Sequence, residues 1–230
     1  MAGEDSNMLA RLEGELSLLA LETELERLSL PPAPEFSIFD ALCVRHENQV
    51  STLLAYLFNI NNRLPDGDNF LREFLRECFK DNSEFLQIIE RQTAWKVRLE
   101  VDISGDEGTK SRRPDIVLES PEIVVFIENK IYPQAIRAGQ VKCTCSYIKA
   151  KPYWKEKPKA YLLIKPKCTE TAVMDGELKD ARENFGHVAS IEWMVLSPFF
   201  RKTACRSSRM RLVLDDLASF AEQIGGGQDG

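Results

Sequence analysis

The stretch RRPDIVLESPEIVVFIENK, residues 112–130, is the part of the chain that best predicts the fold. Two short runs rich in Ile and Val, residues 116–118 and 123–127, flank a polar segment that contains Pro121. Runs of this kind, bounded by turn residues, predict two β-strands joined in a hairpin.

Charged residues stand at the open end of this predicted hairpin. If Leu118 pairs with Ile123, then Asp115 lies diagonally across from Glu128, at roughly 7–8 Å between backbones. Because strand side chains alternate with period 2, Asp115, Glu128 and Lys130 share one face. Two carboxylates and an ammonium at the end of an apolar hairpin are costly to bury unless they pair or hold a metal ion.

These residues, RPD…IENK in the sequence, resemble the signature of the PD-(D/E)XK nuclease superfamily. Upstream, residues 36–59 resemble the opening helix of one branch of that superfamily, which carries a glutamate such as Glu47. Downstream, Gln140 lies in the segment GQVKCTCSYI, which resembles the helix that follows the Glu-x-Lys strand. Residues 187–196 resemble a late strand-then-helix segment, so the resemblance extends over about residues 36–200.

The resemblance implies a restriction-endonuclease-like α/β fold, with a mixed β-sheet flanked by helices, and the order of the predicted elements suits the same architecture. It also implies a nuclease that uses Mg²⁺ or Mn²⁺ to hydrolyse phosphodiester bonds of DNA, in phage defence or DNA repair. Ions of this kind activate water and neutralise phosphate charge, and they bind to carboxylates. By resemblance, the metal ligands are Asp115, Glu128, the Asn129 carbonyl and Glu47, the last directly or as support; Lys130 and Gln140 act on the attacking water or the phosphate.

Other functions fit the sequence less well. A nuclease-like fold kept only for nucleic-acid binding or protein interaction would not need Asp115, Glu128 and Lys130 in one frame. A glycosidase acid pair would leave Lys130 unexplained. The sequence has no GxSxG, P-loop or GxGxxG motif. Of the two histidines, His46 borders the apolar face of its predicted helix, where a core-edge role is more common than metal binding.

The distribution of charge identifies a basic segment. The net charge is −6, but residues 1–40 hold nine acids and two bases, and residues 134–174 hold nine bases and two acids. A local basic surface can bind phosphates whatever the total charge. Tyr153 and Trp154 stand among lysines, a composition suited to binding phosphates and exposed nucleobases. A solvated lysine loop is the plainer alternative. The predicted nucleic-acid contacts are Arg112, Arg113, Lys142, Lys151, Lys155 and Lys157.

The remaining pattern predicts the domains and elements. A leucine-rich acidic helix at residues 8–30 and a Pro-rich linker make an N-terminal segment, 1–34, which either packs on its own domain or docks a partner such as a second copy of the chain. The nuclease-like domain spans 35–224, and 225–230 is a disordered tail. Helices are predicted at 39–59, 70–89, 135–149, 191–200 (capped by Ser190) and 211–224; strands at 95–103, 160–164 and 188–189; and irregular structure at 172–186.

Composition bounds the location. No apolar run reaches the roughly 20 residues needed to span a bilayer, and the acidic start MAGEDSN is unlike a secretory signal. Six cysteines scattered along 230 residues make no disulfide framework. We therefore expect a cytoplasmic protein with no membrane partner.

Overall fold

The computed structural model describes residues 39, 46–58, 67–99, 114–149, 152–167 and 171–225. The chain divides into two units, residues 1–41 and 42–230, and all the elements described below belong to the second. The predicted helix at 8–30, the Pro-rich linker and the tail after Gly225 lie outside the described residues, so they stay predictions.

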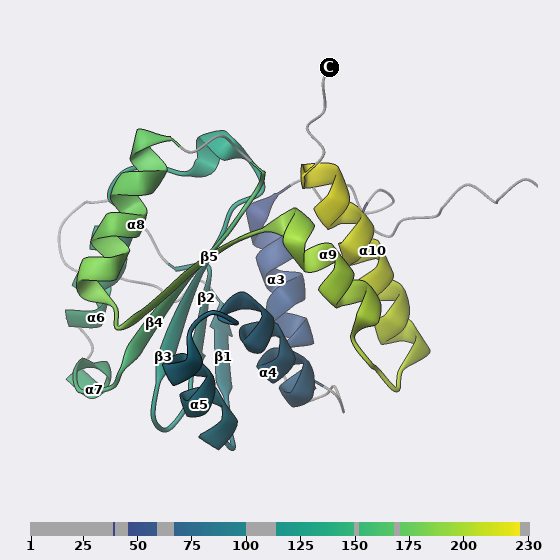
Figure 1. Ribbon diagram of the computed structural model, residues 1–230, viewed down its shortest axis with the longest axis horizontal. Helices are drawn as coiled ribbons and strands as arrows, with labels where there is room; N and C mark the ends of the chain where they lie inside the picture. The colour runs from purple at the N-terminus through teal and green to yellow at the C-terminus, as the bar shows by residue number, and fades with distance from the viewer. Residues whose placement is uncertain are drawn as a thin grey trace, which may run out of the picture. The chain divides into compact units, whose positions relative to one another are not determined.

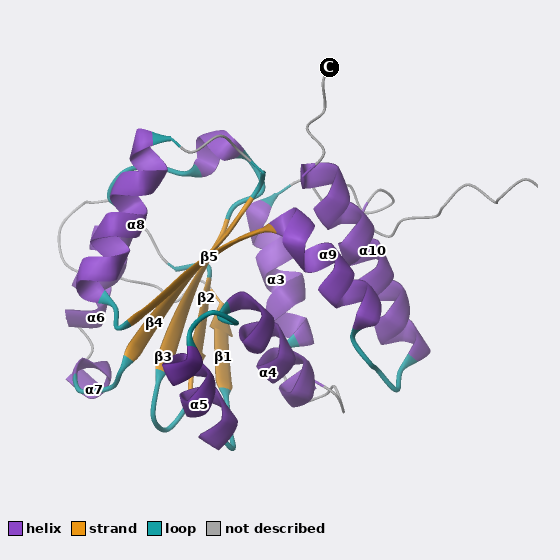
Figure 2. Cartoon of the chain, in the orientation of Figure 1, coloured by secondary structure: helices purple, strands orange, loops and turns teal. Residues whose placement is uncertain are grey.

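A five-stranded mixed sheet forms the centre of the second unit (Figures 1 and 2). The strands lie side by side in chain order. The first three are antiparallel to one another, and the last three are parallel. They are β1 (Lys96–Leu99), β2 (Ile116–Glu119), β3 (Val124–Asn129), β4 (Lys159–Lys165) and β5 (His187–Glu192). This arrangement confirms the predicted α/β class with a mixed sheet flanked by helices.

Helices cover both faces of the sheet (Figure 1). On one face lie α6 (Gln140–Lys149), α7 (Pro152–Lys155) and α8 (Ala172–Asn184), which connect the parallel strands. On the other lie α3 (Glu47–Leu57), α4 (Gly67–Cys78), α5 (Ser83–Arg91), α9 (Trp193–Lys202) and α10 (Ser208–Gly225). Because β3 is central and covered on both faces, all six of its residues are buried, as expected for a strand that reads as a continuous apolar run.

The α6–α8 side of the sheet has its own apolar core. Val117 and Phe126 from the hairpin pack there with Val141 of α6, Trp154 of α7 and Leu178 of α8. Trp154 is fully buried, so its indole is not available to the exposed nucleobases for which the composition of this segment is suited. Its neighbour Tyr153 is exposed.

Two further predictions about local structure are wrong. The segment 172–186, expected to be irregular, forms the regular helix α8. Thr171 caps the start of this helix, because its side chain accepts from the Met174 N–H at 3.2 Å. Ser190 is not a helix cap, because β5 continues through it to Glu192 and pairs with β4. The helix that follows, α9, therefore begins at Trp193.

Among the described residues, no helix combines the length and apolar character that crossing a membrane requires.

Candidate active site

The open end of the hairpin brings Asp115 and Glu128 together. Ile116 pairs with Ile127, so the next position along places Asp115 opposite Glu128. The Asp115 Oδ2 accepts a hydrogen bond from the Asn129 N–H at 2.7 Å, which holds this carboxylate against the end of β3.

The predicted register of the hairpin was wrong by two residues. Leu118 pairs with Val125 rather than with Ile123, because residues 120–123 form the turn: the Ser120 N–H donates to the Ile123 carbonyl at 2.9 Å, and the Ser120 Oγ accepts from the Ile123 N–H at 3.1 Å. A shift of two residues leaves every side chain on its predicted face. The shared face of Asp115 and Glu128 therefore survives the error, and the two lie closer than predicted.

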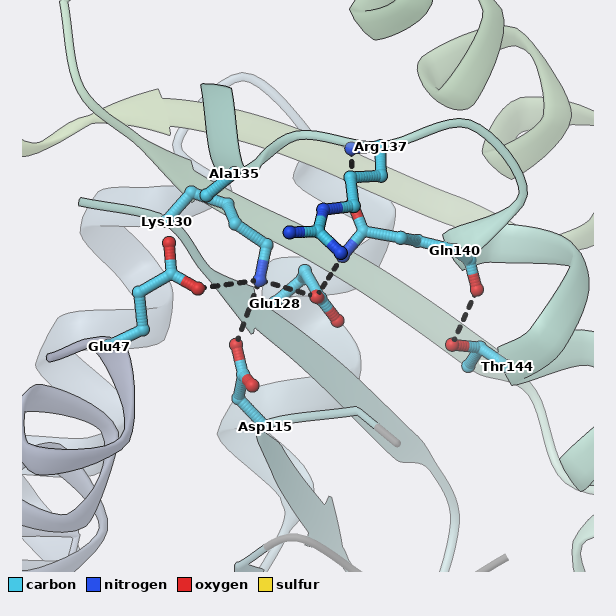
Figure 3. Close-up of a pocket in the computed structure, with 8 residues that line it drawn as sticks. All are labelled: Glu47, Asp115, Glu128, Lys130, Ala135, Arg137, Gln140 and Thr144. Carbon is cyan, nitrogen blue, oxygen red and sulfur yellow. Dashed lines mark hydrogen bonds and ion pairs between the residues drawn. The ribbon is translucent and has the colours of Figure 1, made fainter. Parts of the chain in front are cut away.

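Three carboxylates surround the ammonium group of Lys130 (Figure 3). Its Nζ lies 2.7 Å from the Glu128 Oε1, 3.2 Å from the Glu47 Oε2 and 3.7 Å from the Asp115 Oδ2. Lys130 is only 4% exposed. The single cation is thus outnumbered three to one by the acids that contact it.

Helix α3, on the face of the sheet opposite to α6, supplies Glu47. Asn129 fixes the start of this helix, because its Nδ2 donates to the Ser51 Oγ at 3.1 Å and to the Glu47 carbonyl at 3.3 Å. The Glu47 side chain then reaches past the end of β3, where its Oε1 accepts from the Ile131 N–H at 3.3 Å. The prediction that Glu47 faces inward toward Asp115 and Glu128 agrees with this geometry. His46, exposed just before α3, takes no place in the group.

Gln140, the first residue of α6, joins the group from the other face. Its Nε2 donates to the Glu128 Oε1 at 2.7 Å, and its Oε1 accepts from the Arg137 backbone N–H at 3.0 Å. Glu177 of α8 holds this helix start in place by accepting from the N–H groups of Gly139 and Val141. Gly139 has a φ of 85°, a left-handed conformation that glycine adopts without steric cost.

The indole of Trp193 fixes the backbone of Lys130. Its Nε1 donates to the Lys130 carbonyl at 3.0 Å, and the indole is fully buried at the start of α9. On the other side, the Lys130 N–H donates to the Ile164 carbonyl of β4 at 2.8 Å. The backbone of Lys130 is therefore held by both a strand and a helix.

The side chains of Glu47, Asp115, Glu128, Lys130 and Gln140 line a pocket of about 240 Å³. Besides the residues predicted from the sequence, it is lined by Ala135, Arg137 and Thr144 (Figure 3). Arg137 is one of the nine basic residues of segment 134–174 and is not among the predicted site residues. Its position three residues before Gln140 is the signal in the sequence that places it near the pocket. If Gln140 reaches the site, the residues directly before it in the chain must lie close to the site as well.

Burial and charge change the proton affinities in the pocket. Burial raises the pKa of Glu128 to about 8; the Asp115 carboxylate also raises it, and Lys130 offsets this only in part. Burial lowers the pKa of Lys130, but Glu128, Asp115 and Glu47 together outweigh that effect and raise it above its usual value. Lys130 is therefore charged at neutral pH, whereas Glu128 holds a proton until about pH 8.

The donor set fits a hard divalent cation. The described residues contain no group of three or more His, Cys, Asp or Glu with the spacing of a ready-made metal cage. Mg²⁺, however, is usually held by only one or two carboxylates, with water and substrate phosphate completing its shell. Asp115 and Glu128 meet that requirement, since they lie opposite each other at one end of the hairpin.

Lys142 and Lys157, the predicted nucleic-acid contacts whose side chains the structure describes, are not brought together. Lys142 is an exposed residue of α6 whose Nζ lies 3.4 Å from the Asp180 Oδ2. Lys157 lies at the opposite end of the sheet from the pocket, where its Nζ is 3.2 Å from the Glu119 Oε1 and 2.9 Å from the Ser120 carbonyl. Lys155, at the end of α7, also precedes the start of β4. Arg112, Arg113 and Lys151 lie outside the described residues.

The segment 134–174, predicted to line the nucleic-acid side of the site, takes part in the pocket through its first part. Residues between Ala135 and Thr144 line the pocket, whereas Lys157 contacts Glu119 and Ser120 instead. The physical reason is the crossover. Because β3 and β4 are parallel, the chain must return to the end of the sheet where β3 starts before β4 can begin.

Comparisons with known proteins identify the family. A family model described as the PD-(D/E)XK nuclease superfamily matches residues 36–209, more than half of the chain. Searches of curated proteins and of solved structures found no match. The matched range contains the hairpin, α3 and α6, and so every predicted metal or catalytic residue.

Proposed function

Because the chain belongs to the PD-(D/E)XK nuclease superfamily, we propose that it is a metal-dependent nuclease that hydrolyses phosphodiester bonds of DNA. The observation that carries this proposal is the convergence of Glu47, Asp115 and Glu128 on Lys130 in one pocket. Acids crowded around one buried ammonium are weak evidence for a role in stability, since an apolar cluster is often at least as stable. They are useful where a divalent cation and a phosphate must be held.

Each residue has a role in this proposal. Asp115 and Glu128 hold the ion, with the Asn129 carbonyl as a further oxygen ligand and Glu47 as a support or additional ligand. When bound, Mg²⁺ or Mn²⁺ supplies Lewis-acid neutralisation of the charge that develops on the phosphate. The Lys130 ammonium orients the attacking water and stabilises negative charge in the transition state. Gln140 keeps the Glu128 carboxylate in place through its hydrogen bond.

A digest tests the activity itself. Purified protein is incubated with linear, circular and single-stranded DNA and with RNA, each with Mg²⁺, Mn²⁺ or EDTA. We expect cleavage of DNA with either metal and none in EDTA. Turnover in EDTA would contradict the metal mechanism, and cleavage of RNA alone would correct the substrate. Metal binding without cleavage of any substrate would support a nuclease-like binding module instead.

The raised pKa of Glu128 predicts that metal binding depends on pH. In the metal-free protein Glu128 is protonated below about pH 8, and a metal ligand must be deprotonated. Binding therefore releases up to one proton, and metal affinity should rise by about tenfold per pH unit between roughly pH 6 and 8, then level off. Calorimetry in two buffers with different ionisation enthalpies counts the released proton.

A matched variant controls for other titrating groups. Glu128→Gln keeps the hydrogen-bonding shape without a titrating proton, so its weaker metal binding should lose the pH slope. An equal slope in this variant and in the wild type would show that another group titrates, and the assignment to Glu128 would be wrong.

A further inference from the structure

Arg137 is the cation of the pocket that is available to a ligand. Lys130 is almost completely buried and is engaged by three carboxylates. Arg137 also lines the pocket, but its side chain is exposed. Within the described ranges, no carboxylate lies within ion-pair distance of its guanidinium, whereas its backbone N–H is fixed by Gln140. The residue therefore combines an anchored backbone with an uncommitted charged group.

Two backbone donors at the neighbouring helix start are already engaged. The N-terminus of a helix commonly binds anions through its free N–H groups. At the start of α6, however, the N–H groups of Gly139 and Val141 already donate to the Glu177 carboxylate. These two N–H groups are therefore not available to a phosphate, whereas the exposed Arg137 guanidinium is.

Gln140 links Arg137 to the reacting centre. One of its amide atoms accepts from the Arg137 N–H, and the other donates to the Glu128 carboxylate. These two bonds, of 3.0 and 2.7 Å, fix the distance between the backbone that carries the guanidinium and the carboxylate that is proposed to hold the metal. Figure 3 shows Arg137 and Gln140 on the same side of the pocket as Glu128.

We propose that Arg137 binds a non-bridging oxygen of the nucleic-acid backbone, at the phosphate that is cut or at one directly adjacent to it. This inference rests on the proposed nuclease function and adds a substrate-binding residue to it. A planar guanidinium suits this role because it donates two parallel hydrogen bonds to phosphate. Lysine at this position would keep the charge but lose the paired geometry.

A thermodynamic cycle tests the contact. The binding of DNA and RNA oligonucleotides is measured by fluorescence anisotropy in EDTA, where no metal-dependent cleavage competes. Each backbone phosphate is replaced in turn by an uncharged methylphosphonate. We expect wild-type affinity to fall by about 10- to 100-fold at one position, as for a lost charge-assisted hydrogen bond. Arg137→Ala should bind the unmodified strand more weakly by a similar factor and should be insensitive to methylphosphonate at that same position.

Two further variants separate this contact from general charge. Arg137→Lys should recover only part of the affinity. Arg182→Ala removes the same side chain from an exposed position on α8 and should retain the full wild-type response to the methylphosphonate scan. Because the Arg137 side chain is exposed, the melting temperature of Arg137→Ala should equal that of the wild type.

The outcomes distinguish the contact from the proposed activity. If wild-type protein shows the position-specific loss and Arg137→Ala does not, but Mg²⁺ gives no cleavage, the phosphate contact stands and the nuclease proposal fails. If both proteins respond equally at every position, or neither binds any oligonucleotide, the inference about Arg137 is overturned, whatever the cleavage assay shows.

Discussion

Asp115→Asn is expected to lower the cleavage rate by more than about 100-fold while the protein stays folded. Loss of a residue that merely supports a metal ligand typically costs about 10- to 100-fold, and Asp115 is proposed to be a ligand itself. Asparagine retains a side-chain oxygen that can accept from the Asn129 N–H, so the local backbone contact can persist. Single-turnover cleavage at saturating Mg²⁺ measures the effect.

Stability should respond differently, because Asp115 acts on the protonation of Glu128. Burial and then the Asp115 carboxylate raise the pKa of Glu128 from 4.5 to about 8, and a raised carboxyl pKa lowers stability as the pH rises across that range. The neutral amide removes the contribution of Asp115, so the melting temperature of Asp115→Asn relative to the wild type in EDTA should rise between about pH 4.5 and 8. Asp175→Asn, at an exposed position of α8, is the matched control and should cleave normally. If Asp115→Asn cleaves within tenfold of the wild type, Asp115 is not a ligand.

Lys130→Met is expected to have the largest effect on stability. Removing one partner of a buried ion pair costs about 3–5 kcal/mol of unfolding free energy, because charge is left buried and uncompensated. Here the change leaves the carboxylates of Glu47, Asp115 and Glu128 facing one another without their cation. Denaturant unfolding in EDTA measures the loss, and cleavage should be abolished together with it.

The stability loss should increase with pH. Lys130 has a raised pKa, so its ammonium stabilises the wild type throughout the acid and neutral range and is lost only at strongly alkaline pH. The raised pKa of Glu128 has the opposite consequence: its contribution is most favourable below its usual pKa near 4.5 and declines as the pH rises to about 8. Without Lys130, which lowers that pKa, the decline should continue above pH 8.

A second buried lysine provides the comparison. Lys165, at the end of β4, is also buried, but among the described residues its Nζ lies within ion-pair distance of one carboxylate, that of the partly exposed Glu192 at 3.3 Å. Lys165→Met should therefore cost less than Lys130→Met and should depend less on pH. If the two variants lose equal stability at every pH, the crowding of acids around Lys130 has no special energetic effect.

The central features of the site could be predicted because strand alternation is a strong constraint. The faces of Asp115, Glu128 and Lys130 depend only on whether positions are odd or even, and the two-residue register error left that parity unchanged. Register itself depends on the turn. The Ser120 backbone and hydroxyl bonds to Ile123 shorten that turn, and composition alone does not reveal this geometry.

Features that depend on tertiary contacts could not be predicted in the same way. Tyr153 and Trp154 are adjacent and have the same lysine-rich surroundings, yet only the tryptophan is buried, because the core formed by Phe126 and α8 lies on one side of α7. Ser190 is a good helix cap in isolation, but pairing with Leu163 of β4 keeps it in a strand. In both places packing between distant segments overrides the local preference.

Proximity in sequence misled the prediction for the lysines. Lys157 follows the carboxylate hairpin closely along the chain, but a parallel crossover separates them by the length of a strand. Arg137 is the opposite case, since charge and composition do not separate it from the other basic residues and only its place three residues before Gln140 does. Only the return of the chain to Gln140 brings it to the pocket.

The hydrogen bond from Trp193 to the Lys130 carbonyl gives the protein an intrinsic optical probe. The indole is fully buried and donates a hydrogen bond to the strand end that carries Glu128 and Lys130. Its fluorescence therefore comes from a position close to the reacting groups. Metal or phosphate that shifts this strand end by a fraction of an ångström changes the polarity that the indole senses. Steady-state emission of the unlabelled wild type, compared with Trp193→Phe, can therefore follow ligand entry in real time.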